Sequence, residues 1–136
     1  MLTINCIFDE ESEPDGMDPL GNLVLSDGLS RIVFETTYLD SWLASLIEAV
    51  SELRTRSQVG VEIEEEPHAI EIDATADGHL TISYEKQKIA AEGSKELELA
   101  LRAAVTPFLD ILTNSPEASQ NRFIDSIRRF WVTTKN

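Results

Sequence analysis

The chain has 136 residues, of which 42% are hydrophobic, and its formal net charge is −14. This is enough chain for one domain that buries about two thirds of its unfolded surface. The excess of carboxylates argues against binding to nucleic-acid phosphates or anionic membranes, whereas it permits a basic protein partner.

Three features of the sequence indicate a cytoplasmic protein. No apolar run approaches the ~20 residues that span a bilayer. The first residues, MLTINCIFDEE, lack the basic region and cleavage site of a secretory signal. Cys6 is the single cysteine, so no internal disulfide can form, and we expect it to be a small buried residue.

The first third of the chain predicts a strand, a loop, a hairpin and a helix. Apolar and polar residues alternate over residues 2–8, which is typical of a strand. Residues 9–18, DEESEPDGMD, predict a solvated, mobile loop. Residues 22–37 alternate on both sides of Ser26-Asp27-Gly28 and indicate a hairpin. Asp40 then caps a helix, whose apolar stripe is expected to bury Trp42.

Residues 59–92 predict an antiparallel meander with one solvent-exposed face. Pro67-His68 interrupts the alternation, and Asp77-Gly78 suits a tight hairpin turn. The acidic residues at 62, 64, 66, 71 and 73 alternate with the apolar ones. We expect the buried face to hold Val61, Ile63, Ile70, Ile72, Leu80 and Ile82.

Two helical patterns close the chain. A helix over residues 94–112 should cover the meander through Leu97, Leu101, Val105, Phe108 and Leu109. Ser115-Pro116-Glu117 is a helix start signal, and it predicts a last helix over 115–131. The whole chain, 1–136, is therefore expected to be a single α+β domain. It should hold an antiparallel meander sheet of about six to seven strands, with two to three helices packed on one face.

Candidate metal and catalytic sites are incomplete in this sequence. Residues 11–22 and 73–84 resemble part of a calcium loop, but asparagine and tyrosine stand at the twelfth position, where a bidentate glutamate is required. His68 and His79 do not have zinc-ligand spacing, and no nucleophile elbow or phosphate-binding loop is present. The sequence predicts no metal, no cofactor and no catalytic residue.

The segment Tyr38-Leu39-Asp40-Ser41-Trp42-Leu43 opens a helix that is followed by an acidic meander and a leucine-rich helix. In this order, residues 23–112 resemble small cytosolic bacterial proteins of the toxin-immunity type. The resemblance implies an inhibitor that binds a secreted toxin, often a basic nuclease, and performs no catalysis. No functional residue carries over from it, and it does not extend to the 9–18 loop or the last helix.

The leading hypothesis is a non-enzymatic acidic protein that binds a basic protein partner, such as a toxin, and neither nucleic acid nor membrane. Its candidate binding residues are Glu62, Glu64, Glu66, Glu71 and Asp73. The alternatives are a homodimeric scaffold and an enzyme with an unrecognised site. A dimer would use the last helix, through Phe123, Ile127, Phe130 and Trp131, unless that helix packs on its own domain.

Overall fold

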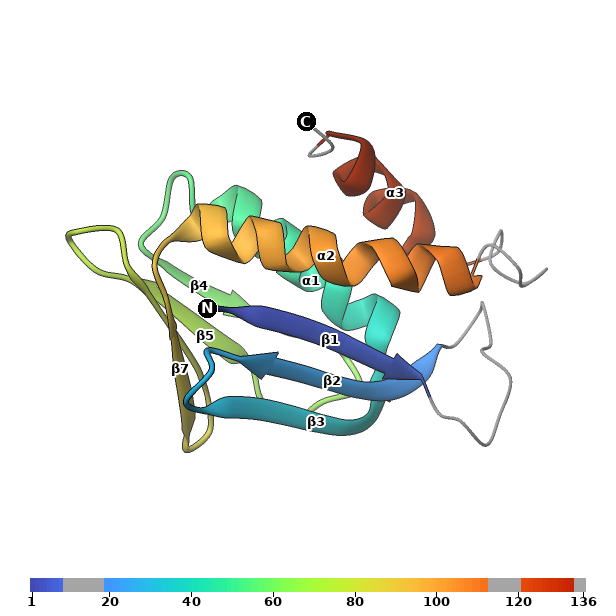
Figure 1. Ribbon diagram of the computed structural model, residues 1–136, viewed down its shortest axis with the longest axis horizontal. Coiled ribbons are helices and arrows are strands. Elements are labelled where there is room, and N and C mark those ends of the chain that lie inside the picture. The colour runs from blue at the N-terminus through green and yellow to red at the C-terminus, as the bar shows by residue number, and fades with distance from the viewer. Residues whose placement is uncertain (9–18, 113–120, 134–136) are drawn as a thin grey trace.

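The structure is a computed structural model, and it describes residues 1–8, 19–112 and 121–133. It confirms a single α+β domain with antiparallel strands (Figure 1). The strands are β1 (Thr3–Phe8), β2 (Leu20–Ser26), β3 (Arg31–Tyr38), β4 (Gln58–Val61), β5 (Ile70–Ala74), β6 (Leu80–Tyr84) and β7 (Gln87–Ala91). The helices are α1 (Leu39–Glu52), α2 (Ser94–Leu112) and α3 (Ile124–Thr133).

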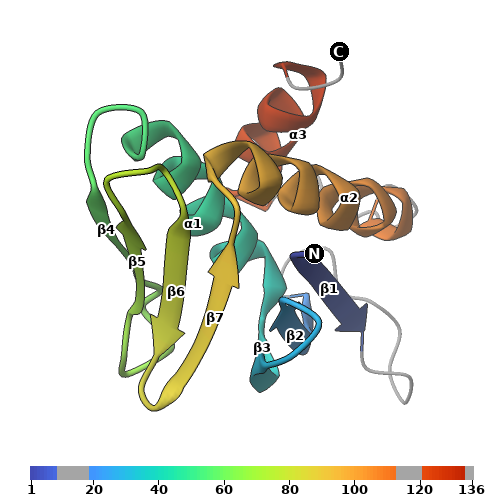
Figure 2. The same cartoon turned by 60° about the vertical axis from the view of Figure 1, so that its left-hand side comes forward.

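The seven strands form two sheets instead of one. β1, β2 and β3 make a three-stranded antiparallel sheet, and β4 to β7 make a four-stranded antiparallel meander. β3 and β7 are the neighbouring strands of the two sheets. Figure 2 shows the two sheets as separate layers, with α1 and α2 packed against them.

The turn between β2 and β3 ties the two sheets together. Asp27 accepts hydrogen bonds from the backbone N–H groups of Ser30 (2.7 Å) and Leu29 (2.8 Å) through Oδ1, and from Ala90 of β7 (3.1 Å) through Oδ2. These N–H groups, that of Ser30 first, hold the pKa of Asp27 below its usual value. Gly28 has a φ of 95°, which suits the predicted turn.

A bulge shapes the far end of β3. The register shifts between Gly21 and Leu23, so that Asn22 faces two residues of β3. One of these is Thr36, which has a φ of 49° and donates its backbone N–H to Asn22 Oδ1 (3.0 Å). The left-handed conformation is unusual for a β-branched residue. The bulge precedes the point where the chain turns from β3 into α1.

The meander follows the predicted alternation of buried and exposed residues, but β4 is shorter than predicted. Gly78 has a φ of 90° in the Asp77-Gly78 turn, and Glu85 has a φ of 53° in the next turn. β4 ends at Val61, however, so Glu62, Glu64 and Glu66 do not continue a strand, and that part of the prediction was wrong. The strand ends early because the chain leaves the sheet to run beside α1, where Ser45 Oγ donates to the backbone carbonyl of Glu62 (2.8 Å).

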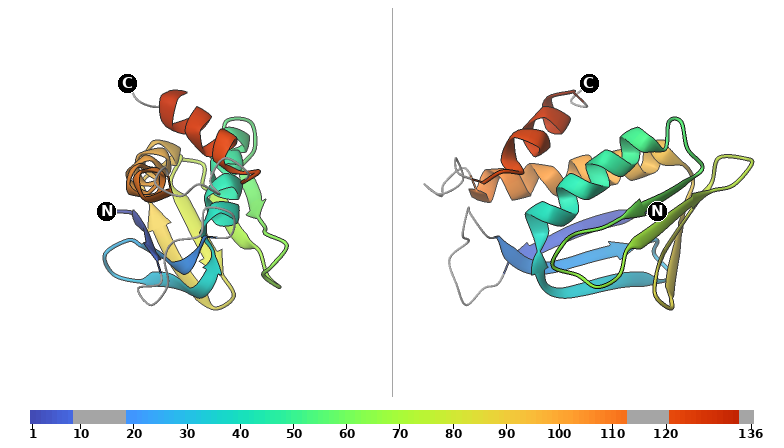
Figure 3. Two further views of the ribbon diagram at one scale, coloured as in Figure 1. Left: turned by 90° about the vertical axis from the view of Figure 1, so that its right-hand side faces the viewer. Right: turned by 180° about the vertical axis from the view of Figure 1, so that it is seen from behind.

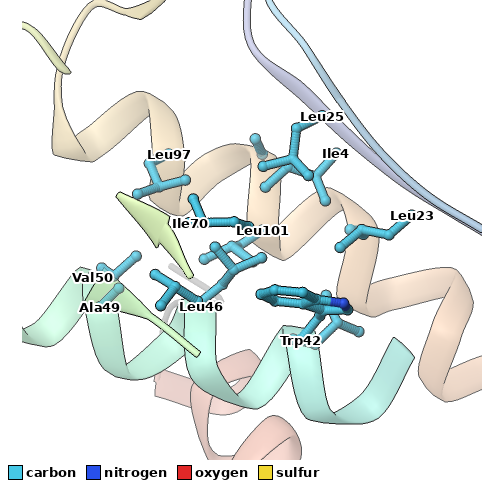
Figure 4. Close-up of a cluster of buried hydrophobic side chains, with 14 of the residues drawn as sticks. Ile4, Leu23, Leu25, Trp42, Leu46, Ala49, Val50, Ile70, Leu97 and Leu101 are labelled. Atoms are coloured by element: carbon cyan, nitrogen blue, oxygen red, sulfur yellow. The ribbon is translucent and has the colours of Figure 1, made fainter. Parts of the chain in front are cut away.

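The core lies between the sheets and the helices, and α3 packs across α1 and α2 (Figure 3). Trp42 is fully buried, as predicted, and points among aliphatic side chains of α1, α2 and the first sheet (Figure 4). The six apolar residues expected on the meander face are all buried, as are Leu97, Leu101, Val105 and Phe108 of α2. Within the described residues, no helix is both long enough and apolar enough to span a membrane.

Two predicted helix starts differ from the structure. α1 begins at Leu39, so Asp40 lies in the first turn instead of at the cap. Asp40 is buried, and its carboxylate accepts hydrogen bonds from Ser41 N–H (2.9 Å) and Asn121 Nδ2 (2.9 Å). α3 begins at Ile124, after a turn in which Asn121 Oδ1 accepts the N–H of Phe123 (2.8 Å). The signal at 115–117 and the loop at 9–18 lie outside the described residues.

Candidate functional site

Glu71 and Asp73 lie on the outer face of β5, where the alternation placed them. In the sheet register Glu71 stands between Gly60 and Ser83, and Asp73 stands beside Gln58. The Glu71 carboxylate oxygens lie 3.8 and 3.9 Å from the point that a Cβ of Gly60 would occupy, so Glu71 leans over a residue without a side chain. Small neighbours therefore leave Glu71 prominent on the face, whereas Asp73 is half-buried between Gln58 and Thr81.

Glu62 and Glu64 extend this surface along the connection from β4 to β5. Both are exposed. Glu64 Oε2 lies 4.0 Å from the Arg122 guanidinium, in a pair open to solvent that contributes little to stability. We call these four carboxylates the acidic face: Glu62 and Glu64 on the connection, and Glu71 and Asp73 on β5.

The fifth predicted residue, Glu66, points away from the acidic face. Its Oε1 accepts a hydrogen bond from Thr37 Oγ1 (2.8 Å), and that same hydroxyl accepts one from Trp42 Nε1 (2.9 Å). Thr37 and Trp42 are buried, whereas Glu66 is half-buried. Glu65, the preceding residue, is exposed, and its Oε1 lies 3.5 Å from Ser41 Oγ. The buried hydroxyl of Thr37 thus links the acidic connection, which is the segment between β4 and β5, to the start of α1.

A second group of polar and aromatic side chains, which sequence reasoning missed, lies beside Glu66. His68 Nε2 is 3.1 Å from Glu85 Oε1, and the His68 ring meets Tyr84 edge-on at 6.2 Å between centroids. Burial raises the pKa of Tyr84, and the negative charges of Glu66 and Glu85 raise it further. The sequence offered only a weak signal for this group. It marked a break at Pro67-His68 and a turn after Tyr84, but nothing in it indicated that these two places lie side by side.

The apolar stripe of α3 lies mainly inside its own domain. Ile127 and Phe130 are buried, and Phe123 and Trp131 are half-buried. Trp131 Nε1 donates to Thr106 Oγ1 of α2 (3.0 Å). This favours the packing of the helix on its own domain, the alternative to a dimer contact through these four residues.

Three further titratable residues, His79, Asp77 and Cys6, have their pKa values shifted by a turn or by burial. His79 Nδ1 lies 2.8 Å from Asp77 Oδ2, and this contact raises the pKa of His79. Hydrogen bonds from Thr75 and His79 hold the pKa of Asp77 well below its usual range. Cys6 as a whole residue is half-buried, but its thiol group is buried, and this burial raises the pKa of the thiol to about 12. The thiol is therefore a poor nucleophile. Among the described residues, no three His, Cys, Asp or Glu side chains are grouped as metal ligands would be.

Comparisons of the chain with protein-family models, curated proteins and solved structures found no match.

Proposed function

We propose that this chain is a non-catalytic binding protein that engages a basic protein partner through the acidic face. The observation that carries the proposal is a group of four carboxylates on β5 and on the connection before it, of which Glu62, Glu64 and Glu71 are exposed and Asp73 is half-buried. Three of them, Glu62, Glu71 and Asp73, have no ion-pair partner among the described residues. Their negative electrostatic potential therefore extends into solvent, where it would speed association with a basic protein surface.

Two hydrogen bonds that hold the connection between β4 and β5 in place support the same role. The acidic connection is held by Ser45 at the Glu62 carbonyl and by Thr37 at the Glu66 carboxylate. A preorganised binding surface loses less conformational entropy when its partner docks. An immunity protein that inhibits a basic toxin in the cytoplasm is the specific form that we propose, in line with the order of elements over residues 23–112.

The proposal is tested with the product of the neighbouring gene, purified with its catalytic residue replaced if it is a toxin. Binding kinetics are then measured for the natural chain and for two variants, Glu71→Lys on the acidic face and Glu48→Lys on α1. Both variants change the net charge equally, and both positions are exposed. We expect Glu71→Lys to slow association several-fold and to reduce its salt dependence, whereas Glu48→Lys stays near the natural rate.

Two outcomes would contradict the proposal. Equal effects of the two variants would mean that net charge, and not the acidic face, guides the encounter. A neighbouring gene whose product is neither toxic nor bound would remove the immunity form of the proposal.

A further inference from the structure

β1 forms an open border of the three-stranded sheet. It pairs with β2 on one side, and α2 lies above its other side, as Figure 2 shows. The other outer strands are covered or blunted. β4 is blunted because it has only four residues, and β3 and β7 cover each other because they lie side by side. An open edge is a template on which another strand can pair.

Backbone groups of β1 face this border without partners. The N–H of Leu2 donates to Glu96 Oε1 of α2 (3.1 Å), which shows that it points away from β2. Alternate residues of an antiparallel strand present their N–H and C=O groups to the same side. The N–H and C=O groups of Ile4 and Cys6 therefore face the border as well, and they have no hydrogen-bond partner among the described residues.

The border is flanked by an apolar groove of about 520 Å³ between β1 and α2. Leu99 of α2, which is 55% exposed, and Ala103 line the groove. Pro107 and Ile111 continue the exposed stripe at the same four-residue spacing along α2. An incoming strand would therefore find unpaired backbone groups beside it and apolar side chains above it.

The sequence of β1 carries none of the devices that usually protect an edge. Thr-Ile-Asn-Cys-Ile-Phe has no charge, no proline and no bulge, and its register with β2 is regular. Its outward side chains Thr3, Asn5 and Ile7 are uncharged, and so are their cross-strand neighbours Val24 and Asn22. The strand itself is therefore uncharged, whereas Glu92, Lys95 and Glu96 lie on the α2 side of the groove.

The uncharged strand favours a second copy of this chain as the occupant. A basic partner would be drawn to the acidic face, whereas two copies of this chain would meet no like charges along β1 itself. We propose that two copies form a symmetric dimer in which their β1 strands pair antiparallel and join the two three-stranded sheets into one of six strands.

The edge of β1 is self-complementary about a two-fold axis. The backbone N–H and C=O groups of Ile4 and Cys6 in one copy can hydrogen-bond to those of Ile4 and Cys6 in the other copy. The two copies of Leu99 and Ala103 would cover the joined strands from the helix side.

Light scattering and sedimentation over a range of concentrations test the proposal, with Leu99→Lys and Val132→Lys compared with the natural chain. Each lysine reduces the net negative charge, so neither variant adds long-range repulsion. Val132 is 65% exposed on α3 and serves as the matched control. We expect Leu99→Lys to weaken the dimer at least about tenfold, because its charged end would lose hydration beside the joined strands, and Val132→Lys to leave it unchanged.

Amide hydrogen exchange on the natural chain supplies a readout that does not depend on a variant. In the proposed dimer, the amides of Ile4 and Cys6 exchange slowly at high concentration and quickly at low concentration. A monomer at high micromolar concentration would overturn the proposal. So would a dimer that Val132→Lys disrupts, or one in which these two amides remain unprotected.

Discussion

The hydroxyl of Thr37 offers the sharpest test of how the acidic connection is held. Thr37→Val keeps the shape of the side chain but removes the acceptor of the Trp42 N–H (2.9 Å) and the donor to Glu66 (2.8 Å). Trp42 is fully buried, so its N–H would lose its partner without access to water. An unsatisfied buried donor costs about 1–3 kcal/mol. The Glu66 carboxylate is half-buried and can be rehydrated, so we expect a total loss of about 2–3 kcal/mol of unfolding free energy.

Two further variants separate the hydrogen bond from packing. Thr37→Ser keeps the hydroxyl and loses one methyl group, which costs about 1 kcal/mol. Trp42→Phe removes the donor, so the double variant Thr37→Val/Trp42→Phe leaves no orphaned N–H. We expect the double variant to be more stable than the sum of the two single losses predicts, by about 1 kcal/mol or more.

Urea unfolding followed by far-ultraviolet circular dichroism gives these free energies, because this signal does not depend on Trp42 itself. Strictly additive losses in the cycle would refute the reasoning. A Thr37→Val variant no less stable than Thr37→Ser would refute it as well.

Three shorter predictions concern the core and the sheet contacts. Ile72→Ala should lower the unfolding free energy by about 2–5 kcal/mol because Ile72 is fully buried, and an unchanged unfolding midpoint would contradict this. Burial raises the pKa of Cys6 to about 12, so a thiol reagent at pH 8 should label it slowly in the native chain and rapidly in urea. The lowered pKa of Asp27 adds stability that is fully present above the ordinary carboxyl pKa and is lost as pH falls through the lowered value. Asp27→Asn should therefore flatten the acid limb of a stability profile, and an unaltered limb would show that the Asp27 contacts do not matter.

Local patterns predicted most of the elements because each signal acts within a few residues. Alternation over residues 59–92 predicted an antiparallel meander, and Asp77-Gly78 predicted a tight turn within it, and the structure confirms both. The division into two sheets could not be predicted in this way. It depends on how β3 and β7 meet although they are far apart in the sequence, with Asp27 reaching Ala90, 63 residues later.

The candidate site was predicted less completely for the same reason. Glu71 and Asp73 lie on a regular strand, so their direction followed from alternation. Glu66 has the same parity as Glu62 and Glu64, but it lies beyond the end of β4 and turns towards Thr37, 29 residues earlier in the chain. A hydrogen bond over that separation leaves no periodic trace in the sequence.

The acidic face and the β1 edge lie on different sheets, and salt should act on them in opposite directions. Binding of a basic partner relies on attraction between unlike charges, which weakens as the Debye length falls from about 10 Å at 0.1 M salt to about 3 Å at 1 M. Pairing of two β1 strands works against the repulsion of two chains with a charge of −14 each, and salt screens that repulsion. We therefore expect added sodium chloride to weaken partner binding and to strengthen the dimer, as measured by sedimentation and association kinetics on one preparation. If both contacts weakened together, the dimer would also depend on opposite charges, and its assignment to the uncharged β1 strand would be wrong.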